Sequence, residues 1–352
     1  MTETVPRVTA DALKSYIARA FVAVGIPAED ATVLGALIAE ADLRGSDTHG
    51  VFRMPPYIKR LRSGGINARP RIRIVEERAS TALIDGDNGM GHLAMKFAAE
   101  TAIRKAKETG VGWAGCRMTN HSGPAALYAM MPLAHDMIGF TLAVGSANHL
   151  PAWGSIEPLL GTSPLAVAVP AEHEPPVVMD MSPTVAAYGK VRLKAARGEE
   201  MPVGWMIDRE GKPLTDPKRM DEGLLVPIGE YKGYGLSLVI GLLAGTLNRA
   251  AFGPDVVDFT KDVGKATNTG HAIVALSVES FMPVAQFKRA VDEAVRAMRG
   301  AQRLPGVERI WLPGEQSHLK YQDRTKNGIP MPKPLRDSLD AVARDLGIAP
   351  LE

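Results

Sequence analysis

The segments that resemble strands all lie in the middle of this sequence, between two ends with helical patterns. Residues 8–43 form a pair of helical segments, which Thr9 can cap and Pro27 interrupts, and apolar residues at 334–346 recur at helical spacing. Alternating or short apolar segments, typical of strands, lie between residues 71 and 278. The sequence therefore predicts a helical part made from both termini and an α/β or α+β core made from the middle.

Seven segments are predicted as strands: 71–76, 81–85, 112–118, 139–144, 165–169, 177–181 and 272–278. The helices predicted among and after them are 92–109, 124–133, 232–250, 287–299 and 334–346. Residues 236–247 are the most apolar stretch, but they cover about half of the ~20 residues that span a bilayer, so a buried helix is expected. The predicted parts are 1–75, 76–280 and 281–352, with the last packing on the first.

The composition limits the classes of partner. Lys and Arg total 41 against 39 for Asp and Glu, a net charge of +2 that does not favour nucleic acid or a membrane. The single cysteine, Cys116, cannot form an internal disulfide, and residues 1–14 lack the features of a secretory signal, so a cytoplasmic protein is expected. The eight histidines show no close ligand spacing, so no metal is predicted. A small molecule is the expected ligand.

A glycine-rich motif, GMGHLA at residues 89–94, matches the G-x-G-x-x-A pattern of a Rossmann dinucleotide-binding turn. That fold requires an acidic residue at the end of the next strand, and no acidic residue occurs between Glu108 and Asp136. We therefore interpret the glycines as a tight turn and a helix start rather than a phosphate site.

Two polar clusters could carry chemistry. Asp47, Thr48, His49 and Arg53 combine a group that exchanges protons near neutral pH with a guanidinium that can bind a carboxylate. The structural alternative is that the cluster caps the next segment. Residues 119–124, TNHSGP, lie where a strand meets a helix, and free backbone N–H groups there favour a phosphate or an oxyanion. A cap around a buried histidine is the alternative.

Other segments are less informative. Residues 229–235 set Lys232 among glycines, which suits a phosphate or a ribose, but a solvated lysine in a loop is the alternative. Residues 312–315 are interpreted as a turn and residues 188–190 as the end of a strand. A serine hydrolase is disfavoured because no G-x-S-x-G motif occurs.

Together these segments resemble the malate/L-lactate dehydrogenase family of the type that lacks a Rossmann domain. The resemblance extends from about residue 31 to residue 320, in the family's order, through AEADLRGSDTHGVFRMPPYIKRL, LIDGDNGMGHLAMKFA, NHSGPAALYA, LGTSPLAVAVP, VVMDMS, VGWMIDREGKPLTDP, GEYKGYGLSLVI and LPGE. Members act on malate, lactate, sulfolactate, ureidoglycolate, diketogulonate and the imino acids piperideine- and pyrroline-carboxylate. All move hydride between nicotinamide and the α-carbon of the acid.

The resemblance implies that His49 exchanges the proton at the substrate oxygen or nitrogen, assisted by Thr48 where many relatives have serine. His121 matches a second histidine that competes for this role, and Arg53 matches the residue that holds the substrate carboxylate. The other implied substrate-side residues are Thr162, Tyr188, Gly189 and Lys190. Some imino-acid reductases of the family carry aspartate in place of Lys190, so this lysine favours a hydroxy or oxo acid.

The resemblance also implies NAD or NADP as the cofactor, bound by the middle part of the chain. The matching positions are His121, Ser122, Gly123, Pro124, Ala125, Val178, Met179, Asp180, Met181, Ser182, Lys232, Gly233, Gly314 and Glu315. The implied fold is α+β, a non-Rossmann nicotinamide-binding fold with a largely antiparallel seven-stranded sheet. The implied assembly is a homodimer with the active site near its interface. Ser122, which replaces a commonly aromatic residue, and the short segment 146–155 are expected to alter the pocket.

The expected function is an NAD(P)-dependent oxidoreductase that transfers hydride between nicotinamide and C2 of a small 2-hydroxy or 2-oxo acid. A cyclic imino-acid reductase that uses the same pocket is the alternative enzyme. A dinucleotide-binding protein without catalysis is the alternative that is not an enzyme, and the joint presence of Thr48, His49 and Arg53 argues against it.

Overall fold

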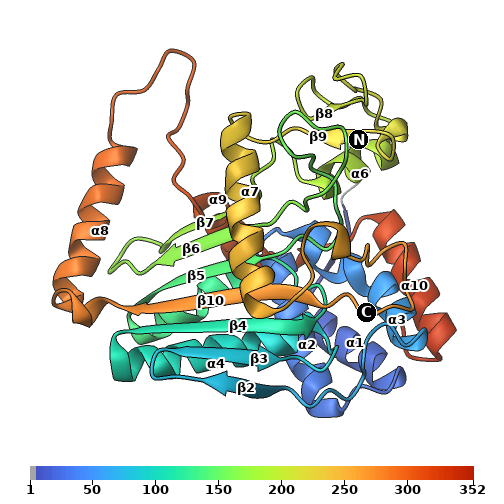
Figure 1. Cartoon of the computed structure of the whole chain (residues 1–352), viewed down its shortest axis with the longest axis horizontal. Helices are drawn as coiled ribbons and strands as arrows, with labels where there is room; N and C mark the ends of the chain where they lie inside the picture. The colour runs from blue at the N-terminus through green and yellow to red at the C-terminus, as the bar shows by residue number, and fades with distance from the viewer. Residues whose placement is uncertain (1–4) are drawn as a thin grey trace.

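The computed structural model describes residues 5–352 and contains one large sheet of seven strands (Figure 1). The order β2-β3-β4-β10-β5-β6-β7 is parallel between β3 and β4 and antiparallel between all other neighbours. All seven segments predicted as strands are strands of this sheet, and the predicted α+β, largely antiparallel class is confirmed. Their bounds are β2 Arg73–Glu77, β3 Thr81–Asp85, β4 Val111–Thr119, β5 Met137–Ala143, β6 Leu165–Val169, β7 Val177–Met181 and β10 Thr269–Ser277.

Helices cover both faces of the sheet centre. α4 (Gly91–Thr109) connects β3 to β4 and packs on one face, while α7 (Tyr231–Ala244) crosses the other (Figure 1). Successive side chains of β10 point to opposite faces of the sheet. Ile273 packs in the cluster with α4, and Ala272 packs in the cluster with α7. At Gly112 a Cβ would lie 2.0 Å from a backbone oxygen of α4, so only glycine permits this close packing.

The helical part combines both ends of the chain, as predicted. Its helices are α1 (Ala10–Ala23), α2 (Ala28–Leu43), α3 (Met54–Arg62), α9 (Glu315–Asn327) and α10 (Lys333–Leu346). Thr9 caps α1 by accepting the N–H of Ala12 at 3.1 Å, and Tyr16 of α1 donates to the carbonyl of Leu339 in α10 at 2.6 Å. A short sheet of β1 (Arg7–Val8) and β11 (Ile329–Pro330) joins the two ends. The boundaries near residues 75 and 280 stay predictions.

α8 (Val284–Arg299) differs from the expectation for residues 281–352. It lies beyond the ends of the strands, next to the connection between β6 and β7, at the far left of Figure 1, and a long loop leads from it to α9. Its buried Asp292 carboxylate accepts the backbone N–H groups of residues 172–174, which connect β6 to β7. These charged hydrogen bonds hold α8 on the sheet rather than on the N-terminal helices.

The prediction that α7 is buried is wrong. Val239 and Leu242 of this helix are 52% and 42% exposed, because one face of a helix that is apolar all round has no neighbour among residues 5–352. α7 also ends at Ala244, where Gly245 leaves helical geometry, rather than at residue 250. Within residues 5–352, no helix is both long and apolar enough to cross a membrane.

Three shorter segments also depart from expectation. Residues 188–190, predicted to end a strand, begin α6 (Tyr188–Arg197), which packs with β8 (Met206–Ile207) and β9 (Leu224–Leu225) in a small separate core. The helix predicted at 124–133 is shortened to α5 (Ala126–Ala129), and a 3-10 turn that contains Pro132 follows it. α9 was not predicted, because its residues are too polar to show a periodic pattern.

Candidate active site

The turn that carries His49 and Arg53 is built on a buried carboxyl group. Two 3-10 turns, Asp47–His49 and Val51–Arg53, connect α2 to α3. Near the end of α2, the buried Asp42 accepts the N–H of Val51 at 2.7 Å, and burial raises the pKa of this carboxyl group well above its ordinary value. A Cβ on Gly50 would lie 2.1 Å from Asp42 Oδ1, so the turn can pack here only with glycine.

The C-terminal helix α9 holds the same turn from the other side. Arg324 forms an ion pair with Asp47 and donates to the backbone carbonyl of Asp42. Ser317 Oγ donates to the carbonyl of Arg44 at 2.9 Å. The turn therefore depends on residues that come more than two hundred positions later in the sequence.

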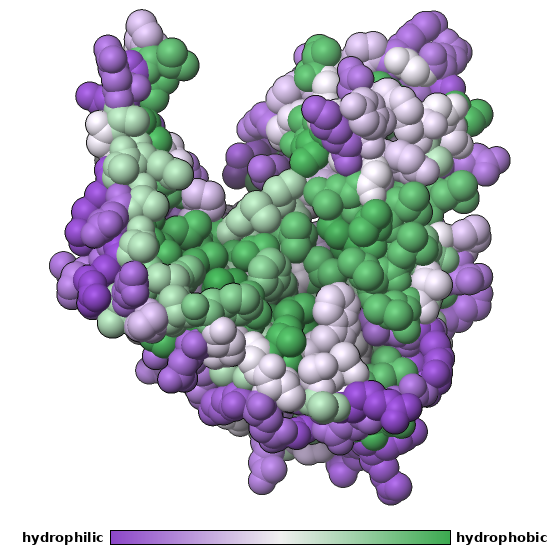
Figure 2. All heavy atoms as spheres, turned by 60° about the vertical axis from the view of Figure 1, so that its left-hand side comes forward, coloured by the Kyte–Doolittle hydropathy of each residue, from purple (hydrophilic) through white to green (hydrophobic). Residues whose placement is uncertain are grey.

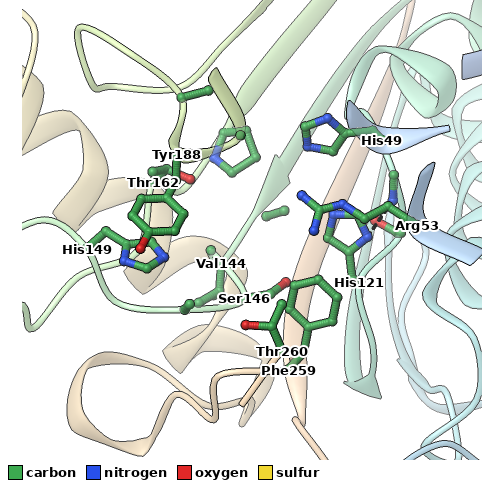
Figure 3. Close-up of a pocket in the computed structure, with 18 of the residues that line it drawn as sticks. His49, Arg53, His121, Val144, Ser146, His149, Thr162, Tyr188, Phe259 and Thr260 are labelled. Carbon is green, nitrogen blue, oxygen red and sulfur yellow. Dashed lines mark hydrogen bonds between the residues drawn. The ribbon is translucent and has the colours of Figure 1, made fainter. Parts of the chain in front are cut away.

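Next to this turn lies a cavity of about 140 Å³. Figure 3 shows His49, Arg53 and His121 on one side, with Thr162, Tyr188 and His149 on the opposite side. Such a volume suits a molecule of a few carbon atoms, because pockets for larger ligands usually exceed about 300 Å³. The predicted site residues that line it are His49, Arg53, His121, Ser122, Gly123, Thr162, Tyr188 and Gly189.

His49 is neutral and has one ring nitrogen available. Thr48 Oγ1 lies 3.1 Å from His49 Nδ1, and Nε2 has no hydrogen-bond partner in the part of the chain that the structure describes. Burial, with a smaller contribution from the charge of Arg53, lowers the pKa of His49 to about 4. His49 is thus a base at neutral pH, oriented by its neighbour.

His121 has a defined tautomer. Both Tyr57 Oη, at 2.5 Å, and the backbone N–H of Gly123, at 3.3 Å, contact its Nδ1. A backbone N–H can only donate, so Nδ1 accepts and the proton of the neutral ring lies on Nε2. The ring is stacked between His49 and Phe259, with centroid distances of 5.5 and 5.2 Å. Burial and then Arg53 lower its pKa well below the usual value, so His121 is a hydrogen-bond donor through Nε2.

Arg53 keeps its terminal nitrogens available for a ligand. Its Nε donates to the carbonyl of Thr48 at 2.8 Å, and its Cζ lies 5.5 Å from the ring centroid of Phe259. Among residues 5–352 no carboxylate forms an ion pair with it, and burial lowers its pKa. A guanidinium held by its inner nitrogen can bind a carboxylate through two parallel hydrogen bonds.

A second cavity has a volume of about 510 Å³, and consecutive residues of one segment line the two cavities. Ser122 and Gly123 line the first cavity and Pro124 lines the second, together with Val178, Asp180 and Gly314. Arg44 and Lys320 add positive charge to its wall. A Cβ on Gly314 would lie 2.9 Å from Val178, so the wall is formed by close backbone packing. The cations, the carboxylate and the apolar walls fit the phosphates, ribose and base of a dinucleotide.

Residues 8–340 match the family model described as malate/L-lactate dehydrogenase. The chain belongs to the malate/L-lactate dehydrogenase family. Malate dehydrogenase from Pyrococcus horikoshii is 35% identical over 350 residues, 97% of this chain and 96% of that protein. L-sulfolactate dehydrogenase from Methanocaldococcus jannaschii is 36% identical over 324 residues, 92% of each. The solved structure of malate dehydrogenase from Entamoeba histolytica has a TM-score of 0.94 at 29% identity, covering 98% of this chain and 99% of that one. This member of the family is therefore an oxidoreductase.

Several residues matched to the family do not line either cavity. Lys190 and Lys232 are exposed at the starts of α6 and α7, and Gly233 is packed beneath Pro183. Glu315 forms ion pairs with Arg299, at 3.2 Å, and Arg309, at 2.6 Å. Four other residues matched to the family also line neither cavity, and their role in cofactor binding stays a prediction: Ala125, Met179, Met181 and Ser182.

Some residues around this candidate site were missed by the sequence analysis. Arg60 is fully buried in α3 and donates to the carbonyls of Gly65, Phe259, Asp262 and Lys265, which fixes the loop that carries Phe259. The signal is that both Arg60 and Tyr57 follow Arg53 at helical spacing in α3, on the side that faces the cavity.

Replacing Tyr57 with phenylalanine is expected to lower turnover about fivefold while leaving the fold intact. The variant loses the hydrogen bond to His121 Nδ1, and one such bond contributes about 1 kcal/mol. The Gly123 N–H still donates to the same nitrogen, so the tautomer persists. Steady-state kinetics check the result, and the control is a Tyr16→Phe variant, which removes the hydrogen bond of an equally buried tyrosine to the carbonyl of Leu339. Equal losses in both variants would contradict a specific role for Tyr57.

Proposed function

We propose that this dehydrogenase transfers hydride between a nicotinamide dinucleotide and C2 of a small 2-hydroxy or 2-oxo acid. The observation that carries the proposal is the Arg53 guanidinium with free terminal nitrogens, beside two neutral histidines in one small cavity. This combination can bind a carboxylate and handle the proton of an adjacent oxygen.

Each residue has a distinct role in this proposal. Arg53 binds the carboxylate of the acid, and His121 donates a hydrogen bond from Nε2 to the oxygen on C2. His49 exchanges the proton of that oxygen through its Nε2, while Thr48 orients the ring through Nδ1. A carboxylate bound to Arg53 offsets the positive charge that lowers the pKa of His49, so substrate binding raises that pKa. The bound nicotinamide supplies or accepts the hydride.

The second cavity is the proposed site for the rest of the dinucleotide, held by Pro124, Val178, Asp180 and Gly314. A carboxylate at such a site suits the free ribose hydroxyls of NAD, whereas the nearby cations suit the extra phosphate of NADP. The second cavity contains both a carboxylate and cations, so the activity is tested with both NADH and NADPH. The buried thiol of Cys116 supports a cytoplasmic location.

A homodimer is part of the proposal. Val239 and Leu242 of α7 are exposed, and so are Phe281 and Met298 at the two ends of α8, at 74% and 59%. Figure 2 shows apolar side chains gathered in the hollow between the projecting α8 arm and the body of the molecule. Apolar areas of this kind usually mark an interface, and light scattering of the purified protein tests for a dimer.

Oxidation of NADH and NADPH with a panel of 2-oxo acids and cyclic imino acids tests the activity. Turnover of a 2-oxo acid is the expected result, and it also identifies the cofactor. Preference for piperideine-carboxylate over every 2-oxo acid would instead identify a cyclic imino-acid reductase. Dinucleotide binding with no turnover of any acid would contradict the proposed activity and leave a binding protein.

A further inference from the structure

The wall of the cavity opposite His49 and Arg53 contains a second arginine. Arg192, in α6, lines the cavity together with Tyr188 and His149. The Tyr188 and His149 rings are stacked, with centroids 3.7 Å apart, and Arg192 Cζ lies 5.3 Å from the Tyr188 ring (Figure 3 labels both rings). Aromatic stacking restricts the guanidinium without using its hydrogen-bond donors.

The nearby carboxylates of Asp221 and Asp258 contact residues other than Arg192. Asp221 accepts a hydrogen bond from Tyr188 and forms an ion pair with Lys261, at 3.1 and 3.7 Å. Asp258 lines the cavity, but its Oδ1 accepts both the N–H and the hydroxyl of Thr260, at 2.9 and 2.7 Å. Over the described range 5–352, Arg192 forms no ion pair and no hydrogen bond with a carboxylate. Its donors therefore remain available to a ligand.

Arg53 and Arg192 line the same cavity. The charge of Arg192 contributes to lowering the pKa of Arg53, and at His149 it acts in the same direction as Lys261, whereas Asp258 acts in the opposite direction. Two unpaired guanidinium groups in a small, partly buried site repel each other, and each loses part of its hydration. A ligand with two anionic groups compensates for both the repulsion and the lost hydration.

We propose that Arg192 determines specificity by binding a second anionic group, a carboxylate or a sulfonate, at the end of the substrate distant from C2. Arg53 binds the carboxylate next to C2, so the favoured substrate is a short 2-hydroxy or 2-oxo acid that is a dianion. The position in α6 fits this role, because Arg192 follows Gly189 by one helical turn and Gly189 also lines the cavity. The inference rests on the proposed function, since it assigns the substrate class of the same site.

Kinetics with matched substrates test the proposal. We expect Arg192→Leu to raise the KM for 2-oxosuccinate by about 100-fold, with kcat within a few-fold, because a charged hydrogen-bonded pair is lost. The KM for pyruvate, which lacks the second anion, is expected to change less than threefold. Arg192→Lys keeps the charge without the bidentate geometry and should recover part of the affinity for 2-oxosuccinate.

Binding without turnover separates this proposal from the proposed activity. Calorimetry with succinate and butyrate, which carry two and one carboxylates and cannot react at C2, should show loss of succinate binding in Arg192→Leu and little change for butyrate. Arg197→Leu, an exposed change on the same helix with the same loss of charge, is the control. An unchanged ratio of diacid to monoacid in both measurements would overturn the role of Arg192. Failure of all turnover with selective loss of succinate binding would overturn the activity alone.

Discussion

Replacing His49 with glutamine is expected to lower kcat by about 10²- to 10⁴-fold, the usual contribution of general acid–base catalysis. Glutamine keeps a polar group in the cavity wall but cannot exchange a proton at neutral pH. The dinucleotide affinity should stay nearly unchanged, because His49 lines the first cavity and not the second. Steady-state kinetics and a fluorescence titration with NADH and NADPH measure the two quantities.

A matched pair of variants makes this result specific. His135 is an exposed histidine outside both cavities, and His135→Gln should leave kcat unchanged. His121→Gln should also reduce turnover, because it removes the Nε2 donor, but the pH dependence of the remaining activity should still follow His49. Full activity in His49→Gln together with complete loss in His121→Gln would reverse the two assigned roles.

Lowering the pH from 7 to 5 is expected to reduce the free energy of unfolding by about 4 kcal/mol through two buried histidines. Burial lowers the pKa of His92 to about 3 and that of His271 to about 4, against an ordinary value of 6.5. The folded protein therefore keeps both rings neutral, whereas the unfolded chain binds protons as the pH falls below 6.5. The stabilisation is complete above that pH and is lost as the pH falls toward the folded pKa values. Each group contributes about 2 kcal/mol by pH 5.

Urea denaturation at the two pH values measures this loss. His92→Phe removes one of the two groups, and both ring nitrogens of His92 are without partners, so its apolar replacement leaves no hydrogen bond unmade. The variant should lose about 2 kcal/mol less stability than the wild type between pH 7 and pH 5, because the contribution of His92 is removed. His135→Gln, at the surface, should behave like the wild type. Equal stability at pH 7 and pH 5 in the wild type would show that the buried rings take up protons without unfolding.

The sequence was sufficient for the elements whose patterns are local. The strands appear as alternating segments between turn residues, and Pro27 marks the break between α1 and α2. The apolar face of α7 could not be predicted, because local hydrophobicity cannot distinguish contact within a chain from contact with a second copy. α6 was missed because four of its ten residues are basic and its small core forms with distant strands.

The site was predictable in its residues but not in its arrangement. His49 and His121 were each identified, yet their stacking depends on Phe259, whose loop is held by the buried Arg60. Nothing in the local sequence distinguishes Asp42 from the polar residues around it, and only the packing of the turn shows it to be buried. The ion pairs of Glu315 join residues from α8, a loop and α9, so no local pattern reveals them.

The contacts of α9 with the His49 turn also have a consequence for biosynthesis. Arg324 and Ser317 hold this turn, and residues 329–330 pair with the strand at residues 7–8. These residues are synthesised after β10, the last strand of the large sheet, so a nascent chain can fold its sheet while His49 still lacks this support. We therefore expect translation products that end before α9 to be inactive even where most of the sheet has formed.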